Sequence, residues 1–296
     1  MPTESIQAAA SAYAYPLLIK QLLHTPLATA ADQEIVYRDS HRQTYRDLAA
    51  RIRRLANALR DAGIGPGDTV AVMDWDSHRY LECFFAVPMM GAVLQTVNVR
   101  LSPEQILYTL NHAGADIVLV NADFMPVLAG IKGQLETVKR FVLISDTGSD
   151  MAMWQIPFVG EYEALLAKAS SEYDFPDFDE NTRATTFYTT GTTGLPKGVY
   201  FSHRQLVLHT LAVATHLGTA EGHGRLHRGD VYMPITPMFH VHAWGVPYIA
   251  TLLGLKQVYP GRYAPETLAR YIHDEKVTFS HCVPPNLQML LTNAEA

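Results

Sequence analysis

Hydrophobic residues in the first half of the chain recur at spacings that predict alternating helices and strands. A capping-box sequence, Thr44-Tyr-Arg-Asp47, precedes apolar residues at steps of four, three and four: Leu48, Ile52, Leu55 and Leu59. Such steps place side chains on one face of an α-helix. Gly63 and Pro66 then end the predicted helix. A second capping-box sequence opens at Ser102 and predicts a helix that ends near Gly114.

Short apolar runs between these helices read as buried strands. We expect strands at residues 69–73, 93–97, 116–120 and 140–144, with a further helix over residues 77–90. Continuous apolar strands between amphipathic helices are typical of a parallel sheet that helices cover on both faces. The pattern predicts an α/β protein.

The alternation continues after an acidic, less periodic stretch at residues 145–181, in which we expect one short helix near residues 161–170. The predicted strands beyond it lie at residues 184–188, 199–201, 231–233, 255–259 and 277–280. The predicted helices lie at residues 202–217, 240–253 and 265–274, and from about 285 onward. We therefore expect two α/β subdomains, residues 1–180 and 181–296. The second is incomplete, because the chain stops just after a helical segment without a cap or polar tail.

Composition narrows the class of protein. Hydrophobic residues make up 48% of the chain and charged residues 18%, which fits a globular protein. The net charge of −6 gives no basic footprint for nucleic acid. Cys83 and Cys282 are far apart and match no metal or redox motif. The start of the chain lacks a basic secretory leader, and no apolar stretch reaches the ~20 residues of a membrane span, so we expect a cytoplasmic protein.

The run Tyr188-Thr-Thr-Gly-Thr-Thr-Gly-Leu-Pro-Lys-Gly198 carries the strongest chemical signal. It combines four threonines, three glycines and a lysine. Glycines let backbone N–H groups turn toward one anion, threonine hydroxyls add donors, and Lys197 adds a positive charge. A polyphosphate is the ligand that needs all of these. The run is not a Walker A loop, because Pro196 stands where that motif has glycine, and the flanks predict strand–loop–strand. The alternative is a Gly/Thr-rich surface turn.

This run resembles the phosphate-binding loop of the adenylate-forming superfamily, usually Tyr-Thr-Ser-Gly-Thr-Thr-Gly-x-Pro-Lys-Gly. Thr190 replaces the serine and keeps its hydroxyl. Thr236-Pro-Met-Phe-His-Val-His-Ala-Trp244 resembles the acyl-site motif of the fatty-acid branch, in which Asn usually stands at the position of His242. The Asn-Val-Arg-Leu sequence that follows Gly91-Ala92 resembles a third family segment. The resemblance implies the N-terminal domain of the adenylate-forming fold, of which we expect this chain to be the N-terminal portion.

The resemblance also implies a function. It is ATP-dependent activation of a medium- or long-chain fatty acid to an acyl-adenylate, with release of pyrophosphate, and then thioester formation with CoA. The implied ATP-binding residues are Thr189, Thr190, Gly191, Thr192, Thr193, Gly194 and Lys197. Thr189 would also lie beside Mg²⁺. The family's glutamate motif for that ion, Tyr-Gly-x-Thr-Glu, is missing from this sequence. The expected fragment alone would be inactive, and a homodimer is compatible with the resemblance.

Two further residues are implied at the acyl site. The expected catalytic residues are Lys197 and His240, of which His240 would orient the carboxylate. The expected acyl-pocket residues are His240 and Trp244, of which Trp244 would gate the fatty-acid tunnel. A helix over residues 240–253 would place both on one face. The alternatives are a buried core histidine and an ordinary core aromatic residue.

Other functions stay open at this point. An aryl acid is an alternative substrate, and a truncated, non-catalytic phosphate-binding or dimerisation module is an alternative of another class. Seven of the thirteen histidines fall between His203 and His242, which raises the alternative of a zinc site. His240 and His242 form His-x-His, but no acidic or cysteine partner stands nearby in the sequence.

Overall fold

A computed structural model describes residues 4–148, 151–190 and 194–294. In these residues seven strands form one sheet in the order β7-β6-β5-β3-β4-β8-β9. Its strands are β3 (Thr69–Met73), β4 (Val93–Thr96), β5 (Ala115–Asn121), β6 (Arg140–Ile144), β7 (Phe158–Glu161), β8 (Arg183–Thr189) and β9 (Lys197–Ser202). All neighbours pair in parallel except β8 and β9, which form an antiparallel hairpin at the edge.

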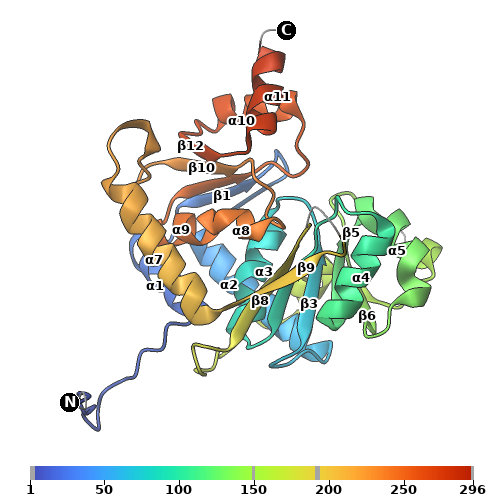
Figure 1. Cartoon of the computed structure of the whole chain (residues 1–296), viewed down its shortest axis with the longest axis horizontal. Coiled ribbons are helices and arrows are strands. Elements are labelled where there is room, and N and C mark those ends of the chain that lie inside the picture. The colour runs from blue at the N-terminus through green and yellow to red at the C-terminus, as the bar shows by residue number, and fades with distance from the viewer. Residues whose placement is uncertain (1–3, 149–150, 191–193, 295–296) are drawn as a thin grey trace.

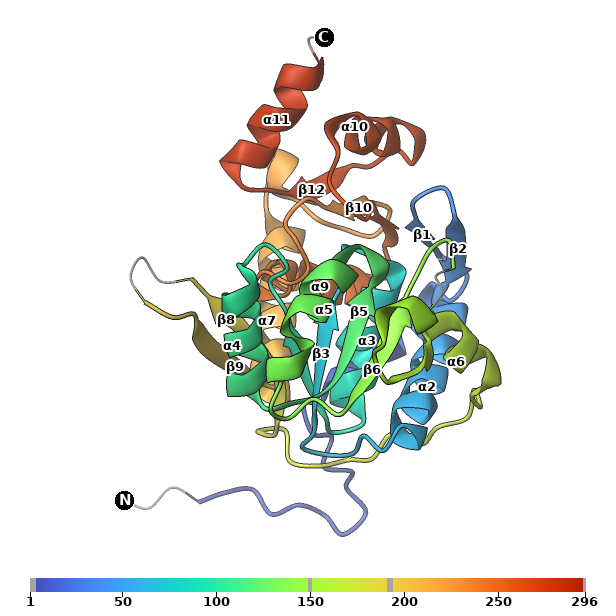
Figure 2. The ribbon, with the colours of Figure 1, turned by 90° about the vertical axis from the view of Figure 1, so that its right-hand side faces the viewer.

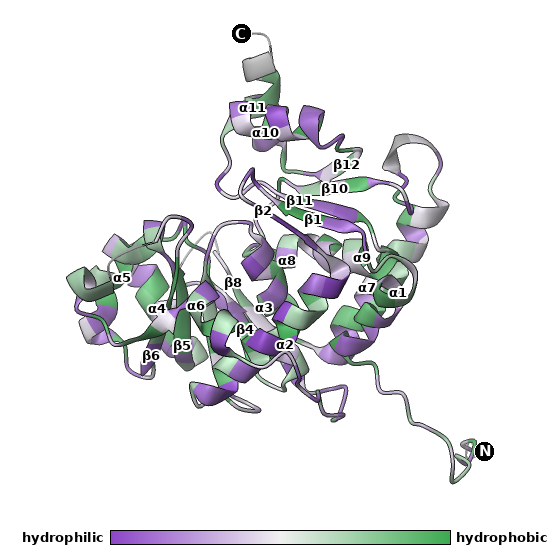
Figure 3. Cartoon of the chain, turned by 180° about the vertical axis from the view of Figure 1, so that it is seen from behind, coloured by the Kyte–Doolittle hydropathy of each residue, from purple (hydrophilic) through white to green (hydrophobic). Residues whose placement is uncertain are grey.

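Helices cover both faces of this sheet, as the sequence predicts. Along β5, Ile117 and Leu119 pack on one face, and Val118 and Val120 pack on the other. The first face is covered by α2 (Tyr45–Asp61), α3 (His78–Met89) and α6 (Tyr162–Lys168). The second face is covered by α4 (Pro103–Ala113) and α5 (Met125–Ile131). Figure 3 shows hydrophobic residues along β5 and a mixture of hydrophilic and hydrophobic residues along α2.

A second sheet of five described strands has the order β12-β10-β11-β1-β2. Its strands are β1 (Glu34–Tyr37), β2 (His41–Thr44), β10 (Val231–Pro234), β11 (Lys256–Tyr259) and β12 (Phe279–His281). One face packs against α10 (Pro265–Asp274) and α11 (Pro284–Ala294), and the other meets α7 (His203–Thr219) and α9 (Val246–Leu253). The core that contains α2 and α3 includes residues of both sheets, so these helices lie between them (Figure 1).

The predicted boundary at residue 180 does not follow the division between the sheets. β1 and β2 join the strands from the end of the chain, because the apolar run Ile35–Tyr37 pairs in parallel with residues 257–259 of β11. In the other direction, β8 and β9 complete the first sheet. Both halves of the sequence therefore supply strands to both sheets, although the α/β class with mostly parallel sheets is confirmed.

Three helix starts agree closely with the sequence. Capping boxes are present at Thr44, Ser102 and Ser202, where the side chain and the third residue of the helix bond each other's backbone N–H groups. The remaining helical elements are α1 (His24–Thr29), α8 (Val241–Trp244) and short 3-10 turns at Ile19–Leu23, Ala122–Phe124, Lys132–Gln134, Met151–Trp154 and Gly222–Gly224. Within the described residues no helix has the length and apolar character that a membrane crossing requires.

Candidate functional site

The phosphate-loop sequence is held by the hairpin of β8 and β9. Thr189 pairs with Lys197 at its open end, and the Thr189 hydroxyl lies 3.5 Å from the Lys197 carbonyl oxygen. The structure thus confirms the predicted strand–loop–strand arrangement and brings Thr189 and Lys197 together. Figure 2 shows the two strands at the edge of the sheet.

The described residues around this loop face solvent. Thr189, Thr190, Gly194 and Lys197 are exposed. Gly194 has a φ of +99°, a conformation that L side chains rarely adopt, and no described residue would lie within 4 Å of a Cβ atom there. The expected phosphate ligands Gly191, Thr192 and Thr193 lie outside the described residues.

Lys197 is an unneutralised cation in this part of the molecule. Among the described residues, no carboxylate lies within ion-pair distance of its ammonium group. A lysine that only stabilised the fold would gain from a nearby acid, whereas one that binds an anion gains from having none. The exposed hydroxyls and the free ammonium group together suit an anionic ligand.

The base of the hairpin is rigidly placed. Tyr188 is buried, and its hydroxyl lies 2.8 Å from Nδ1 of His112 on α4. A Cβ atom at Gly198 would come within 3.3 Å of the Tyr188 ring, so the last glycine of the motif lets β9 pass this ring closely. Two residues before Thr189, the Phe187 ring stacks on Phe201 of β9. The exposed loop therefore rises from a packed aromatic base.

The second motif forms a loop that both sheets hold in place. The Asp76 carboxylate, just after β3, accepts a hydrogen bond of 2.8 Å from the backbone N–H of Met238 and another from the Tyr263 hydroxyl. The Thr96 hydroxyl, at the end of β4, donates to the Phe239 carbonyl oxygen at 3.1 Å. Burial raises the pKa of Asp76 to about 7, although both hydrogen bonds favour its charged form. Sequence reasoning missed Asp76 and Thr96.

His240 lies at the end of this loop and is exposed. Partial burial, together with the positive charge of Arg100, lowers the pKa of its imidazole below the ordinary value. The ring is therefore neutral at pH 7 and keeps one N–H donor and one lone pair. Its backbone N–H bonds the Pro237 carbonyl oxygen at 2.9 Å, which closes the loop.

The predicted helix over residues 240–253 is wrong in its first turn. Val241, His242, Ala243 and Trp244 all have φ between +48° and +55°, so α8 is a left-handed turn, and the right-handed helix begins at Val246. His240 and Trp244 consequently do not share the face of an α-helix. A left-handed conformation costs about 1–2 kcal/mol per residue, so tertiary contacts must hold it.

Those contacts centre on His242 and Trp244. The buried His242 ring meets Phe84, Phe187 and Phe201 with ring centroids 5.7, 5.4 and 6.1 Å away. Nε2 of His209, on α7, lies 3.1 Å from the Trp244 carbonyl oxygen. The aromatic base of the phosphate hairpin therefore packs directly on the turn that carries the acyl-site motif.

Trp244 is 57% exposed, so it is not an ordinary core residue. His242 is the buried member of the turn, and burial followed by the charge of His209 lowers its pKa to about 3. Within the described residues, no group of three or more His, Cys, Asp or Glu side chains is arranged to hold a metal ion.

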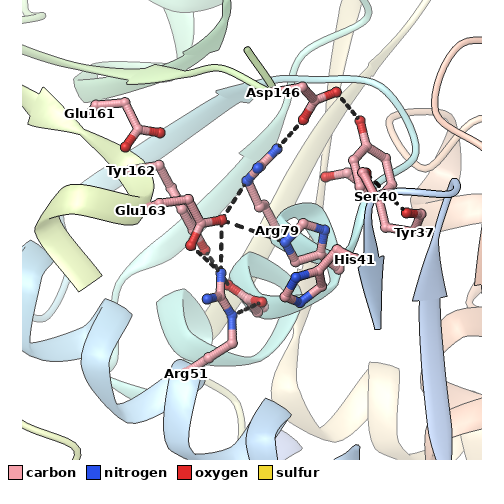
Figure 4. Close-up of polar contacts among 12 residues, drawn as sticks. Tyr37, Ser40, His41, Arg51, Arg79, Asp146, Glu161, Tyr162 and Glu163 are labelled. Carbon is pink, nitrogen blue, oxygen red and sulfur yellow. Dashed lines mark hydrogen bonds and ion pairs between the residues drawn. The ribbon is translucent and has the colours of Figure 1, made fainter. Parts of the chain in front are cut away.

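A cluster of charged contacts joins α2, α3 and α6 and has a structural role (Figure 4). Arg51 pairs with Glu82 and Glu163, and Arg79 pairs with Glu163 and Asp146. The cluster ties α2, α3 and α6 to the end of β6, and Arg38, which also pairs with Asp146, brings it to three arginines and three carboxylates.

Comparison with known proteins indicates the family to which the chain belongs. A family model described as AMP-binding enzyme matches residues 23–296. The chain is 44% identical, over 82% of its length and 42% of the relative's, to a long-chain-fatty-acid–CoA ligase of Thermus thermophilus. It is 38% identical, over 94% of its length and 52% of the relative's, to a 3-methylmercaptopropionyl-CoA ligase of Ruegeria lacuscaerulensis. The chain thus spans about half the length of these curated relatives.

A solved structure shares the fold. The fold of the chain matches that of a long-chain-fatty-acid-CoA ligase from Archaeoglobus fulgidus with a TM-score of 0.81, 21% identity, and coverage of 96% of this chain and 55% of that one. The hairpin presents Thr189 and Lys197 to solvent, and both the fold and the family model match. The chain therefore belongs to the family of AMP-binding, adenylate-forming enzymes.

Proposed function

We propose that the whole protein is an AMP-forming ligase that joins a fatty acid to CoA. One observation carries the proposal. An exposed hairpin, whose Lys197 has no acidic partner among the described residues, packs through Phe187 and Phe201 on the turn that follows His240. The base of the hairpin thus contacts the turn that directly follows His240, which supports a site that combines anion-binding groups with a neutral imidazole. Adenylation needs both, because a carboxylate must attack the α-phosphate of ATP while pyrophosphate departs.

In this proposal the hairpin binds the departing phosphates. Lys197 neutralises negative charge that builds up on pyrophosphate, and the hydroxyls of Thr189 and Thr190 donate hydrogen bonds to phosphate oxygens. The expected ligands Gly191 to Thr193 would add backbone N–H groups. Because these donors are fixed before the reaction, little reorganisation is needed as charge develops.

Mg²⁺ fits one described position of this site. The exposed Thr189 hydroxyl is a hard oxygen ligand, and Mg²⁺ commonly takes few protein ligands and completes its shell with water and substrate phosphates. Bound there, the ion would supply positive charge to the phosphates. In the described residues Thr189 has no acidic cluster beside it, so the proposal assigns most of the shell to ATP and water.

His240 would orient the carboxylate of the acid. Its neutral ring donates one hydrogen bond to a carboxylate oxygen without forming an ion pair that would hold the nucleophile back. The loop that carries His240 is fixed by Asp76 and Thr96, so the imidazole has a defined position. Trp244, exposed one turn away, would border the entry of the acyl chain.

We propose that the acid is aliphatic, because the apolar side chains of Val241 and Leu206 lie at the turn. A relative named for a fatty acid supports the proposal, whereas another is named for methylmercaptopropionate, so the class of acid needs a direct test. CoA is proposed as the acceptor of the activated acyl group. Two outcomes would replace the proposed function: an aryl acid as the substrate, or a phosphate-binding module without catalytic activity.

The test is ATP–pyrophosphate exchange by the whole protein with decanoate, palmitate, short acids and benzoate, followed by thioester formation with CoA. Exchange that depends on an aliphatic acid, and acyl-CoA as product, support the proposal. Exchange with benzoate alone would assign an aryl substrate. ATP binding without exchange for any acid would leave a non-catalytic module.

A further inference from the structure

The open end of the phosphate hairpin reaches beyond the strand next to it. Phe187 is the last residue of β8 that pairs with β4. The next two residues, Tyr188 and Thr189, pair with Gly198 and Lys197 of β9, and β4 does not continue beside them. A two-stranded ribbon of this kind is marginally stable by itself. The ribbon therefore depends on side-chain contacts for a fixed position.

Tyr188 contacts both arms of the hairpin. It directly precedes Thr189, and its ring packs against the backbone of Gly198, where a Cβ atom would come within 3.3 Å of the ring. Gly198 in turn directly follows Lys197. The place of the Tyr188 ring therefore affects the positions of both the Thr189 hydroxyl and the Lys197 ammonium group.

His112 holds this ring from α4. The Tyr188 hydroxyl lies 2.8 Å from Nδ1 of His112, and the two rings meet edge to face with centroids 5.8 Å apart. Burial raises the pKa of Tyr188, so the phenol is neutral and one of the two groups supplies the hydrogen. The helix is itself fastened to the sheet, because the Gln95 amide of β4 donates to the Thr109 carbonyl oxygen at 3.0 Å.

The preceding residue holds the hairpin on the opposite side. Successive side chains of a strand point to opposite faces of the sheet. Phe187 accordingly faces away from Tyr188 and packs on the buried His242 of the left-handed turn. Phe187 thus connects the hairpin to the acyl-site motif, whereas Tyr188 connects it to α4, which carries none of the expected acyl-site residues. Loss of the Tyr188 contact should therefore alter phosphate binding more than acid binding.

We propose that His112 is a positioning residue for the phosphate hairpin and that it acts through the Tyr188 hydroxyl. The inference rests on the proposed function and adds to it a residue outside the sequence motifs. His112 holds the ring on which Gly198 packs, and so keeps Thr189 and Lys197 in place to bind pyrophosphate. Without the hydrogen bond the ribbon would adopt the binding arrangement for only part of the time, which lowers the apparent affinity for phosphates.

The experiment measures ATP–pyrophosphate exchange by the whole protein with the acid that supports it best. His112→Phe keeps an aromatic ring on α4 and removes the bond to Tyr188. We expect the KM values for ATP and for pyrophosphate to rise about three- to tenfold, the effect of one hydrogen bond. The KM for the acid should stay the same. His112→Asn places an amide atom near the position of Nδ1 and should restore most of the affinity.

A double-variant cycle tests the partner. Tyr188→Phe keeps the ring on Gly198 and loses only the hydroxyl, so it should match His112→Phe, and the combined variant should be no worse than either one. His216→Phe is the matched control, because His216 is, like His112, an exposed histidine in the last turn of its helix. Its KM values should equal those of the unaltered protein. Thermal unfolding checks that each variant folds.

Unchanged KM values for ATP and pyrophosphate in folded His112→Phe would overturn the inference. A combined variant whose loss equals the product of the single losses would also overturn it, as would an equal rise in the KM for the acid. If His112→Phe does not fold, the inference requires a raised KM for ATP in Tyr188→Phe and a nearly normal one in His112→Asn. All these results leave exchange by the unaltered protein intact. Absence of exchange with every acid would instead overturn the proposed function, and this inference with it.

Discussion

The phosphate hairpin and the acyl-site loop contact each other through Phe187 and Phe201, but different forces shape them. The hairpin's open end is exposed, and its residue types alone indicate an anion ligand. The loop is held by groups far away in sequence: Asp76 bonds Met238, and His209 bonds Trp244. A local motif can thus specify the chemistry of one half of a site, while the geometry of the other half depends on the whole fold.

Lys197→Ala should separate activity from stability at the hairpin. Removing one fixed donor to a developing charge typically costs about 3–4 kcal/mol of transition-state stabilisation, or about 100- to 1,000-fold in rate. Because Lys197 is exposed and unpaired in the described residues, we expect a change of less than about 0.5 kcal/mol in the free energy of unfolding. Pyrophosphate exchange measures the activity, and thermal unfolding measures the stability. Lys139→Ala, exposed before β6, is the control, and unchanged exchange in Lys197→Ala would remove the hairpin from the reaction.

Asp76→Ala should lower both the activity and the stability of the protein. It leaves the Met238 N–H and the Tyr263 hydroxyl without their acceptor, which should lower the free energy of unfolding by about 3 kcal/mol. The KM for the acid should rise more than the KM for ATP, because the loop carries His240. Asp76→Asn keeps one acceptor oxygen and should lose about 1 kcal/mol. Equal losses in the two variants would show that the hydrogen bonds to Met238 and Tyr263 do not position the loop.

Two glycines allow a direct comparison of the regions. Gly245 has a φ of +73°, and a Cβ atom there would lie 2.8 Å from the His209 ring, whereas a Cβ atom at Gly194 would meet none of the described residues within 4 Å. We expect Gly245→Ala to cost about 2 kcal/mol of stability and Gly194→Ala about 1 kcal/mol, since both need a left-handed conformation but only one clashes. Denaturant titration measures both losses of stability. A larger loss for Gly194→Ala than for Gly245→Ala would contradict the close approach of Gly245 to the His209 ring.

The two regions should also differ in how they make stability depend on pH. The pKa of His242 falls from 6.5 to about 3 on folding, so below pH 6.5 the unfolded chain binds a proton that the folded chain does not. Stability from this group is present above pH 6.5 and is lost as the pH falls toward 3. His242→Leu should reduce the slope between pH 4 and 6 by at most about 1.4 kcal/mol per pH unit. Lys197→Ala should leave the slope unchanged, and an unchanged slope in His242→Leu would refute burial as the cause.

Local signals account for what the sequence predicted well. The capping boxes at Thr44, Ser102 and Ser202 depend on residues three apart, and the buried strands β3 to β6 are short apolar runs. The hairpin was predictable for the same reason. Asp76 carried one unused signal, since polar residues just after a buried parallel strand lie at the edge where α/β proteins bind ligands.

Residues 240–245 show the limit of local reasoning. The sequence Val-His-Ala-Trp can form a right-handed helix, and nothing within it specifies the left-handed turn. The turn is set by the cage around His242, which comes from α3, β8 and β9, and by His209 from α7. The pairing of β1 with β11 was missed for a similar reason, because parallel partners lie more than 200 residues apart.

That long-range pairing has a consequence for synthesis. The ribosome completes β1 more than 200 residues before it reaches β11, which at about 5–20 residues per second is an interval of tens of seconds at the slower rates. During this interval the strands of the first sheet emerge through β9 and can assemble, while β1 keeps an unpaired apolar edge. The nascent chain therefore passes through a stage in which one sheet can be complete and the other waits as an isolated hairpin. Exposed strand edges invite wrong pairing, so pulse-labelled chains arrested after β9 should bind chaperones, and chains arrested after β11 has left the exit tunnel should bind them less.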